Sequence, residues 1–221
     1  MMASARGPIG VSIEAGQRKV FAWAIGWPGW CRSGKDEASA LEVLAAYAPR
    51  YAAVVARAAV SWPADAGHRL AVTERLAGSS GTDFGVPGQV GAQDRRPVST
   101  AQARQICALV AAAWAIFDEV AASAPASLRK GPRGGGRDRD KVVSHVTEAD
   151  HAYAREMGLK SRLPDPADEA AVREMRVSML EALSARSDGS PLAGRRWPPR
   201  YAARRISWHV LDHAWEIEDR S

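Results

Sequence analysis

Hydrophobic positions follow one pattern up to about residue 96 and another pattern beyond it. In the first part, short runs of β-branched and aromatic residues predict three strands. They cover residues 10–16, 19–25 and 70–76. A longer run over residues 36–57 carries an apolar stripe at helical spacing and predicts one helix, which Pro49 would kink or end. Residues 78–96 are rich in glycine, serine, aspartate and proline and are expected to be a loop or a domain boundary.

From Ser99 onward, apolar residues recur every three to four positions, which is typical of amphipathic helices. Segments rich in glycine or proline divide this pattern into four predicted helices. They cover about residues 99–123, 138–157, 168–185 and 205–220. Four amphipathic helices joined by loops favour a bundle. The sequence therefore predicts an α+β protein, with a small β-β-α-β domain over residues 1–95 and an all-α four-helix bundle over residues 96–221.

The composition predicts a folded protein, and the cysteine pattern makes the reducing cytoplasm the expected location. Of the 221 residues, 46% are apolar, so a packed core is expected. The two cysteines lie far apart and outside any CxxC pattern, which argues against a disulfide scaffold and a thiolate zinc site. No hydrophobic run typical of a signal peptide is visible at the N-terminus. The apolar stretch 106–117 is shorter than the roughly 20 residues that span a bilayer, so no membrane association is expected.

Charge makes nucleic-acid binding the weakest of the functions considered. The net charge is only +5, and the basic residues concentrate in two segments, 129–141 and 195–205. A dedicated nucleic-acid-binding domain is usually more basic than this. The glycine-rich segment 125–136 contains no GxxxxGK[ST] motif, so a phosphate-binding P-loop is rejected and a flexible loop is expected.

Three histidines are predicted to point into the helical part. His209 and His213 are four residues apart on the last predicted helix, on the same face as several apolar residues. His145 falls on the apolar stripe of the helix over residues 138–157, whereas His151 falls among polar residues. Two inward imidazoles on the last helix make a good half of a metal site, and His145 is the predicted partner from the other helix. The alternative, a set of hydrogen-bonded core histidines, stays open at this point.

The N-terminal part resembles the HicB-like antitoxin fold. The likeness rests on the predicted order β-β-α-β, on the segment Trp27-Pro-Gly-Trp-Cys-Arg-Ser-Gly34, and on the Asp36-Glu-Ala38 that follows it. A HicB-type antitoxin usually adds a small DNA-binding domain, whereas long helices follow here. The resemblance therefore implies a fold for this part, without DNA binding or toxin neutralisation.

The C-terminal part, residues 98–221, resembles the DinB-like superfamily. The matching segments run from Lys141 to Tyr153, which includes His145, and from Trp208 to Glu216, which includes His209 and His213. Members include metal-dependent thiol S-transferases and mycothiol-dependent maleylpyruvate isomerases. The resemblance implies Zn²⁺ or Ni²⁺ on the three histidines, with one position open. A low-molecular-weight thiol such as mycothiol would bind there as its thiolate and attack an electrophile.

Four charged residues complete the predicted site. Glu216 or Asp212 would hold a ligand imidazole or act as a catalytic base. Arg200 and Arg204 would bind the carboxylates of a thiol cofactor. For each of the four, an ordinary charged surface residue is the alternative. The alternative for the whole protein is a non-catalytic interaction protein, in which the HicB-like part contacts a partner and the bundle is a scaffold. The oligomeric state is left open, a dimer included.

Overall fold

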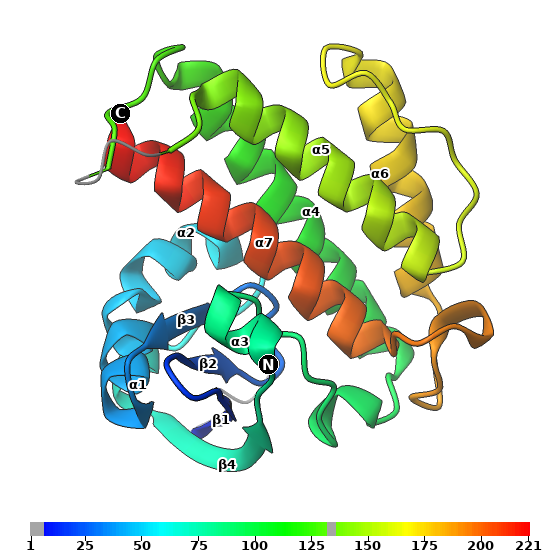
Figure 1. The fold of residues 1–221 in the computed structure, drawn as a ribbon. Coiled ribbons are helices and arrows are strands. Elements are labelled where there is room, and N and C mark those ends of the chain that lie inside the picture. The colour runs from blue at the N-terminus through cyan, green and yellow to red at the C-terminus, as the bar shows by residue number, and fades with distance from the viewer. Residues whose placement is uncertain (1–6, 132–135) are drawn as a thin grey trace.

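The predicted α+β class is confirmed by a computed structural model, which describes residues 7–131 and 136–221 (Figure 1). These described residues form one four-stranded mixed sheet and seven α-helices. Residues 1–6 of the predicted N-terminal domain and residues 132–135 of the predicted glycine-rich loop lie outside the described residues.

The sheet has the strand order β3-β2-β1-β4, in which only β1 and β4 run parallel. Its strands are β1 (Ile9–Ala15), β2 (Val20–Ala24), β3 (Cys31–Gly34) and β4 (Leu70–Ala77). The predictions of β1, β2 and β4 are confirmed. The sequence missed β3, because Cys31-Arg-Ser-Gly34 contains no β-branched residue and its strand conformation depends on antiparallel pairing with β2.

The predicted helix over residues 36–57 is two helices, α1 (Glu37–Ala46) and α2 (Ala48–Arg57). They meet at Tyr47, two residues before Pro49, because a proline cannot donate the backbone hydrogen bond of a helix interior. Asp36 caps α1 by accepting a hydrogen bond from the backbone N–H of Ser39 at 2.8 Å. A third, short helix, α3 (Ser80–Phe84), lies within the predicted loop 78–96.

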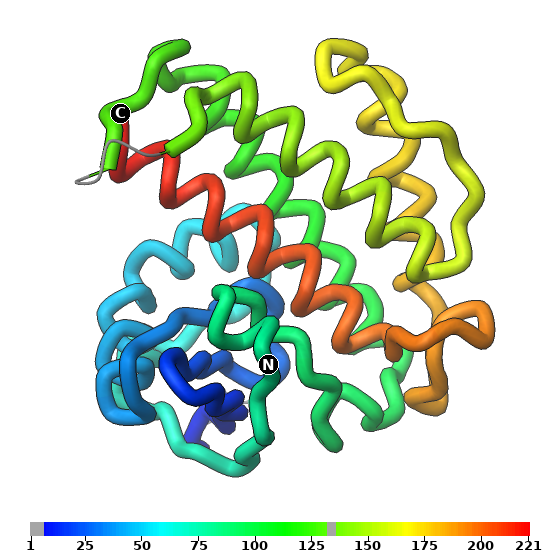
Figure 2. The backbone as a smooth tube through the Cα atoms, viewed as in Figure 1, coloured from blue at the N-terminus to red at the C-terminus, as the bar shows by residue number. Residues whose placement is uncertain are grey.

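Both faces of the sheet are covered. Alternate residues of β1 and β2, such as Val11, Ile13 and Ala22, belong to the main core, and α1 packs against β2 and β3. The residues between them face the other way: Phe21 and Trp23 form a second cluster with Cys31 of β3 and Trp208. Trp208 belongs to the last helix, which Figure 2 shows crossing between the sheet and the other long helices. The C-terminal helix is therefore packed on the sheet as well as on its helical neighbours.

The segment predicted as a boundary is held to the sheet by two carboxylates. Glu14 of β1 is fully buried and accepts hydrogen bonds from the Thr82 hydroxyl at 2.5 Å and from the backbone N–H of Gln89 at 2.9 Å. Glu74 of β4 accepts from the backbone N–H of Ala92 at 2.7 Å. Because a buried carboxylate is costly without donors, these bonds determine how the segment lies over the sheet.

The four predicted long helices are confirmed. They are α4 (Thr100–Ser123), α5 (Arg139–Glu156), α6 (Glu169–Ser184) and α7 (Pro199–Arg220). Ser99 caps α4, and Gly158 follows α5 with a positive φ of 87°, as predicted. The last helix begins at Pro199 and not near Arg205, because proline fits the first turn of a helix. Each of α4 and α5 packs against both α6 and α7 (Figure 1).

Among the described residues, α4 is the one helix long and apolar enough, by length and composition alone, to cross a membrane. It extends beyond the apolar stretch 106–117 considered above. A single helix of this kind is a weak indication, since core helices of soluble proteins have the same composition. α4 contacts α2, α6 and α7, which is the packing of a core helix.

One hydrophobic core joins the sheet to the long helices. Its buried members include Ile13 of β1, Leu44 of α1, Leu109 of α4 and Ile206 of α7. Close contact between the two parts also involves Gly29, whose φ is +92°. A Cβ atom there would lie 2.6 Å from Leu211 Cδ1 of α7.

Gly29→Ala is expected to lower the free energy of unfolding by roughly 1–3 kcal/mol, from backbone strain and the clash with α7. Urea unfolding measures the loss. Gly26→Ala is the matched control, because Gly26 has a similar φ of +83° but nothing within 4 Å of its Cβ position. We expect Gly29→Ala to lose more unfolding free energy than Gly26→Ala, and the difference measures the cost of the clash with α7. Equal losses in the two variants would show that α7 moves away without cost.

Candidate metal centre

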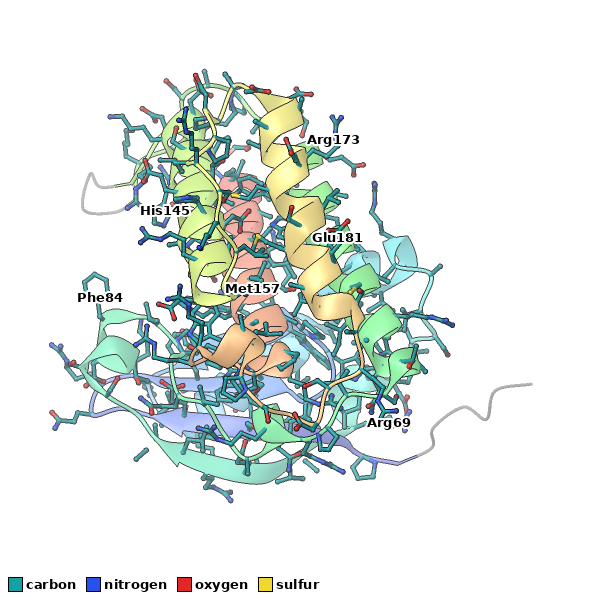
Figure 3. The ribbon with its side chains drawn as sticks, turned by 90° about the vertical axis from the view of Figure 1, so that its right-hand side faces the viewer. Arg69, Phe84, His145, Met157, Arg173 and Glu181 are labelled. Atoms are coloured by element: carbon teal, nitrogen blue, oxygen red, sulfur yellow. The ribbon has the colours of Figure 1, made fainter. Side chains whose placement is uncertain are left out.

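The structure brings together the three histidines that the helical periodicity selected. His145 lies on α5 (Figure 3). His209 and His213 lie one turn apart on α7, on the side where their rings contact His145. The ring centroids of His145 are 5.0 Å from those of both His209 and His213, and the latter two are 4.7 Å apart. One ring nitrogen from each residue lies within 4.8 Å of the others. The three side chains therefore form one cluster between two packed helices.

One pair of ring nitrogens is spaced as two metal ligands require. The Nε2 atoms of His145 and His209 are 3.1 Å apart. Two nitrogens on a tetrahedral zinc ion, each about 2.0–2.1 Å from it, are about 3.3 Å apart. His213 directs its Nδ1 to Glu216 Oε2 at 2.8 Å, so its Nε2 is the nitrogen available to the cluster.

Burial keeps the cluster in the form that binds metals. It lowers the pKa of His209 well below its ordinary value, and the neighbouring His213 lowers it further. The same two causes lower the pKa of His145. Both imidazoles are therefore neutral near pH 7, and a neutral imidazole has a nitrogen lone pair for a metal ion.

Glu216 is hydrogen-bonded to one of the three histidines, His213. Its hydrogen bond with His213 is the largest cause of the lowered pKa of the carboxyl group, so the carboxylate is ionised. Its second oxygen accepts from Arg220 Nη1 at 2.6 Å. A carboxylate bound to the outer nitrogen of a ligand histidine sets its tautomer and ring orientation. Since both oxygens are engaged, Glu216 is placed to position His213.

The other predicted carboxylate, Asp212, is not placed with the histidines. It forms an ion pair with Arg32 of β3 at 2.8 Å. The Arg32 guanidinium in turn lies 4.1 Å from the centre of the Tyr47 ring. These contacts connect α7 to the sheet and to the α1–α2 junction. The assignment of Asp212 as a catalytic base stays a prediction, and no contact with a histidine supports it.

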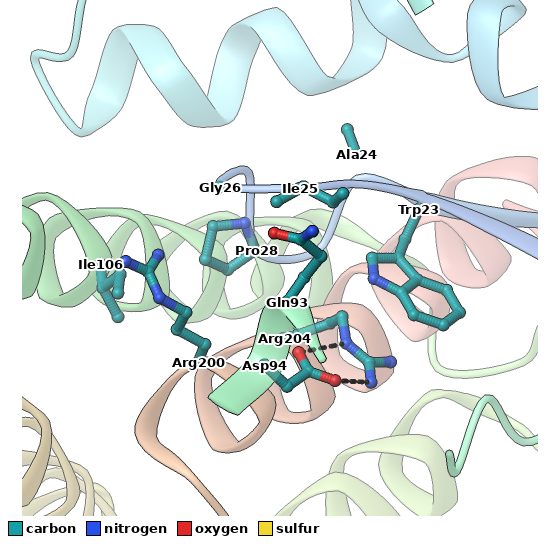
Figure 4. Close-up of a pocket in the computed structure, with 10 residues that line it drawn as sticks. All are labelled: Trp23, Ala24, Ile25, Gly26, Pro28, Gln93, Asp94, Ile106, Arg200 and Arg204. Atoms are coloured by element: carbon teal, nitrogen blue, oxygen red, sulfur yellow. Dashed lines mark hydrogen bonds and ion pairs between the residues drawn. The ribbon is translucent and has the colours of Figure 1, made fainter. Parts of the chain in front are cut away.

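Arg200 and Arg204 line a small cavity on another side of α7 (Figure 4). Arg204 is buried and forms an ion pair with Asp94, with Nη2 2.8 Å from Oδ2. Arg200 donates to the backbone carbonyl of Pro97 at 2.8 Å. None of the residues that line this cavity is a histidine. Their binding of a thiol cofactor stays a prediction, and the structure does not bring them to the cluster.

Sequence reasoning missed two neighbours of the cluster, Tyr153 and Arg205. The Tyr153 ring of α5 lies 5.7 Å from the His209 ring and 5.4 Å from Arg205 Cζ. The sequence did contain a signal for Arg205, because the four-residue spacing that pairs His209 with His213 also places Arg205 on that face of the helix. His151, by contrast, is bound outside the cluster, with Nε2 2.9 Å from the Ser161 carbonyl oxygen.

No family model, curated protein or solved structure matches this chain. The chemistry of the cluster therefore has to be inferred from its own geometry. Two neutral imidazoles and a third held by a carboxylate fit a divalent ion such as Zn²⁺ or Ni²⁺. Three protein ligands leave a coordination position for water or substrate.

A second polar cluster shares α5 with His145. Asp150 is fully buried and accepts from Trp114 Nε1 at 2.9 Å and from Arg176 Nε at 3.3 Å. Burial raises the pKa of Asp150 to about 6, although Arg176 opposes this shift. Arg176 also binds Asp118 of α4 at 2.9 Å. The network connects α4, α5 and α6 on the side of α5 that faces α4 and α6.

Asp150 is expected to make the protein more stable as the pH falls from 7 to 5. Its folded pKa lies above the ordinary value of 3.8, so the folded state binds the proton first on acidification. The gain is about 1 kcal/mol over this range. Urea unfolding of wild type and Asp150→Asn at both pH values measures the gain, since the variant has no titrating carboxyl group at this position. An identical pH response in the two proteins would show that Asp150 stays ionised throughout.

Proposed function

We propose that the chain binds one divalent metal ion, Zn²⁺ or Ni²⁺, through His145, His209 and His213. The observation that carries the proposal is the convergence of three imidazoles between α5 and α7, two of them kept neutral by burial. The alternative is a hydrogen-bonded pair of core histidines, because Nε2 of His145 and Nε2 of His209 are also within hydrogen-bond distance, at 3.1 Å. That pairing gives His213 Nε2 no role in the cluster, whereas a metal ion uses one nitrogen from each of the three residues.

The proposal includes the architecture that the DinB-like resemblance implies. The pairing of α4 and α5 with both α6 and α7 supports a four-helix bundle of that class. The N-terminal part, with the sheet and the helices α1, α2 and α3, is proposed to be HicB-like. A cytoplasmic location is proposed because Cys31 and Cys107 are both free thiols.

The proposed activity is a thiol-dependent S-transfer or isomerisation. When bound, the metal ion would supply a Lewis acid that holds a low-molecular-weight thiol, such as mycothiol, as its thiolate. The chain contributes the neutral imidazoles and the Glu216 carboxylate that orients His213. Burial of His209 behind Tyr153 and Trp208 limits the access of water to the inner side of the site.

Elemental analysis of the protein purified without a histidine tag tests the proposal. We expect about one zinc or nickel per chain, removed by a chelator and restored by the added ion. Consumption of a thiol in the presence of an electrophile, measured with loaded and chelated protein, then tests the activity. A protein that contains no metal and does not bind added zinc or nickel would overturn the proposal.

A non-catalytic interaction protein is the second candidate. Phe84, on α3 beside the sheet, is 86% exposed and is the most exposed large apolar side chain among the described residues (Figure 3). Isolated exposed aromatic residues are common, so this observation is weaker than the histidine cluster. Capture of a specific partner that Phe84→Ser abolishes, together with no thiol turnover, would favour this candidate.

A further inference from the structure

We propose that a carboxylate of the ligand binds beside the histidine cluster, at Arg205, His209 and Tyr153. The inference rests on the proposed metal-binding function and names the chemical class of its substrate. The carboxylate belongs either to the thiol or to the electrophile that reacts with it. Three observations lead to this subsite: an unpaired buried guanidinium nitrogen, an unpaired buried imidazole nitrogen, and a phenol next to both.

Arg205 carries a positive charge that no carboxylate neutralises among the described residues. Its Nη1 atom is buried and has no hydrogen-bond partner. The guanidinium lies over two aromatic rings, with Cζ 4.7 Å from the Trp208 ring and 5.4 Å from the Tyr153 ring. The buried Arg176 and Arg204 each have a carboxylate partner instead. Since a buried donor without an acceptor is costly, a ligand anion is the missing partner of Arg205.

His209, one turn along α7, also lacks an acceptor. Its Nδ1 atom is buried and has no hydrogen-bond partner in the part of the chain that the structure describes. When Nε2 of a neutral imidazole is a ligand, Nδ1 carries the proton and needs an acceptor. His213 has such an acceptor in Glu216, at 2.8 Å. The two histidines on α7 therefore differ, and the difference points to an oxygen that a ligand supplies to His209.

Arg205 and His209 lie one turn apart on the same face of α7. Tyr153 neighbours both residues, and the structure gives its hydroxyl no hydrogen-bond partner among the described residues. A carboxylate has two oxygens and can accept several such hydrogen bonds at once, and its charge strengthens each of them. One helical turn rises about 5.4 Å, so a ligand that reaches both the open metal position and Arg205 is short.

Cobalt-loaded protein provides a test that does not depend on turnover, because a thiolate on Co²⁺ produces a charge-transfer absorption band. The band is titrated with 3-mercaptopropionate and with the neutral 2-mercaptoethanol. We expect the carboxylate-bearing thiol to bind about tenfold to a hundredfold more tightly. Arg205→Gln should remove this preference and leave the affinity for 2-mercaptoethanol unchanged, while Arg205→Lys should retain part of it.

A second titration identifies the source of the carboxylate. Acetate is added to the cobalt protein that already holds 2-mercaptoethanol, and its binding is measured by calorimetry. Acetate binding in wild type that is lost in Arg205→Gln assigns the carboxylate to the electrophile. A preference for 3-mercaptopropionate, lost in the same variant, assigns it to the thiol.

The controls separate this inference from the metal site itself. Arg104→Gln changes an exposed arginine of α4 and should alter neither titration. Cobalt stoichiometry and the thermal midpoint show whether each variant is folded and loaded. Failure of wild type to bind cobalt would overturn the proposed function. Cobalt and thiol binding without any effect of a carboxylate, or with the same effect in Arg205→Gln, would overturn the subsite alone.

Discussion

His209→Ala is expected to abolish stoichiometric metal binding. The substitution removes one of three nitrogen ligands. That ligand is one of the two Nε2 atoms that lie 3.1 Å apart. Two remaining imidazoles do not make a specific zinc site, which normally has three or four protein ligands. Elemental analysis after dialysis measures the loss, and His145→Ala should reproduce it. Thermal unfolding of the metal-free proteins shows whether the alanine also affects the fold.

Two further variants make the expectation specific to this cluster. Glu216→Gln keeps the three ligands but weakens the bond that orients His213, and it should reduce metal affinity about 10- to 100-fold. His151→Ala is the matched control on α5, since His151 bonds to the Ser161 carbonyl outside the cluster. Full metal content in His209→Ala, with loss in His151→Ala, would place the site elsewhere.

Arg204→Met is expected to destabilise the fold by about 3–5 kcal/mol without changing metal content. The substitution leaves the carboxylate of Asp94 buried and unpaired, and breaking one partner of a buried ion pair has a cost of this size. It also removes the guanidinium that lies 4.0 Å from the Trp23 ring and joins α7 to the sheet. Urea unfolding at pH 7 measures the change.

A double variant and a neighbouring arginine test this explanation. Asp94→Asn combined with Arg204→Met should recover part of the stability, because the uncompensated charge is gone. Arg200 lies one turn earlier on α7. Arg200→Met loses hydrogen bonds to exposed groups such as the Pro97 carbonyl, so its effect on stability should be smaller. Weak destabilisation by Arg204→Met, together with impaired thiol binding, would instead support the cofactor-binding role predicted from the sequence.

Local periodicity was sufficient for the long helices and for the choice of histidines. Which face of a helix a residue occupies depends only on its position relative to nearby apolar residues. For that reason the sequence could separate His145 from His151, and could place His209 beside His213. The caps at Ser99 and Gly158 are also local, because each satisfies backbone groups within one turn.

The tertiary structure decided what the local pattern could not contain. Strand β3 has no strand-forming residues and exists through its pairing with β2. Arg204 and Arg205 are adjacent in sequence, yet one is neutralised by Asp94 and the other faces the histidine cluster. The difference depends on a carboxylate 110 positions away from Arg204. The sequence by itself determined which helical faces are buried, and only the packing of distant segments decided which buried charges find partners, because electrostatic pairing acts through space and not along the chain.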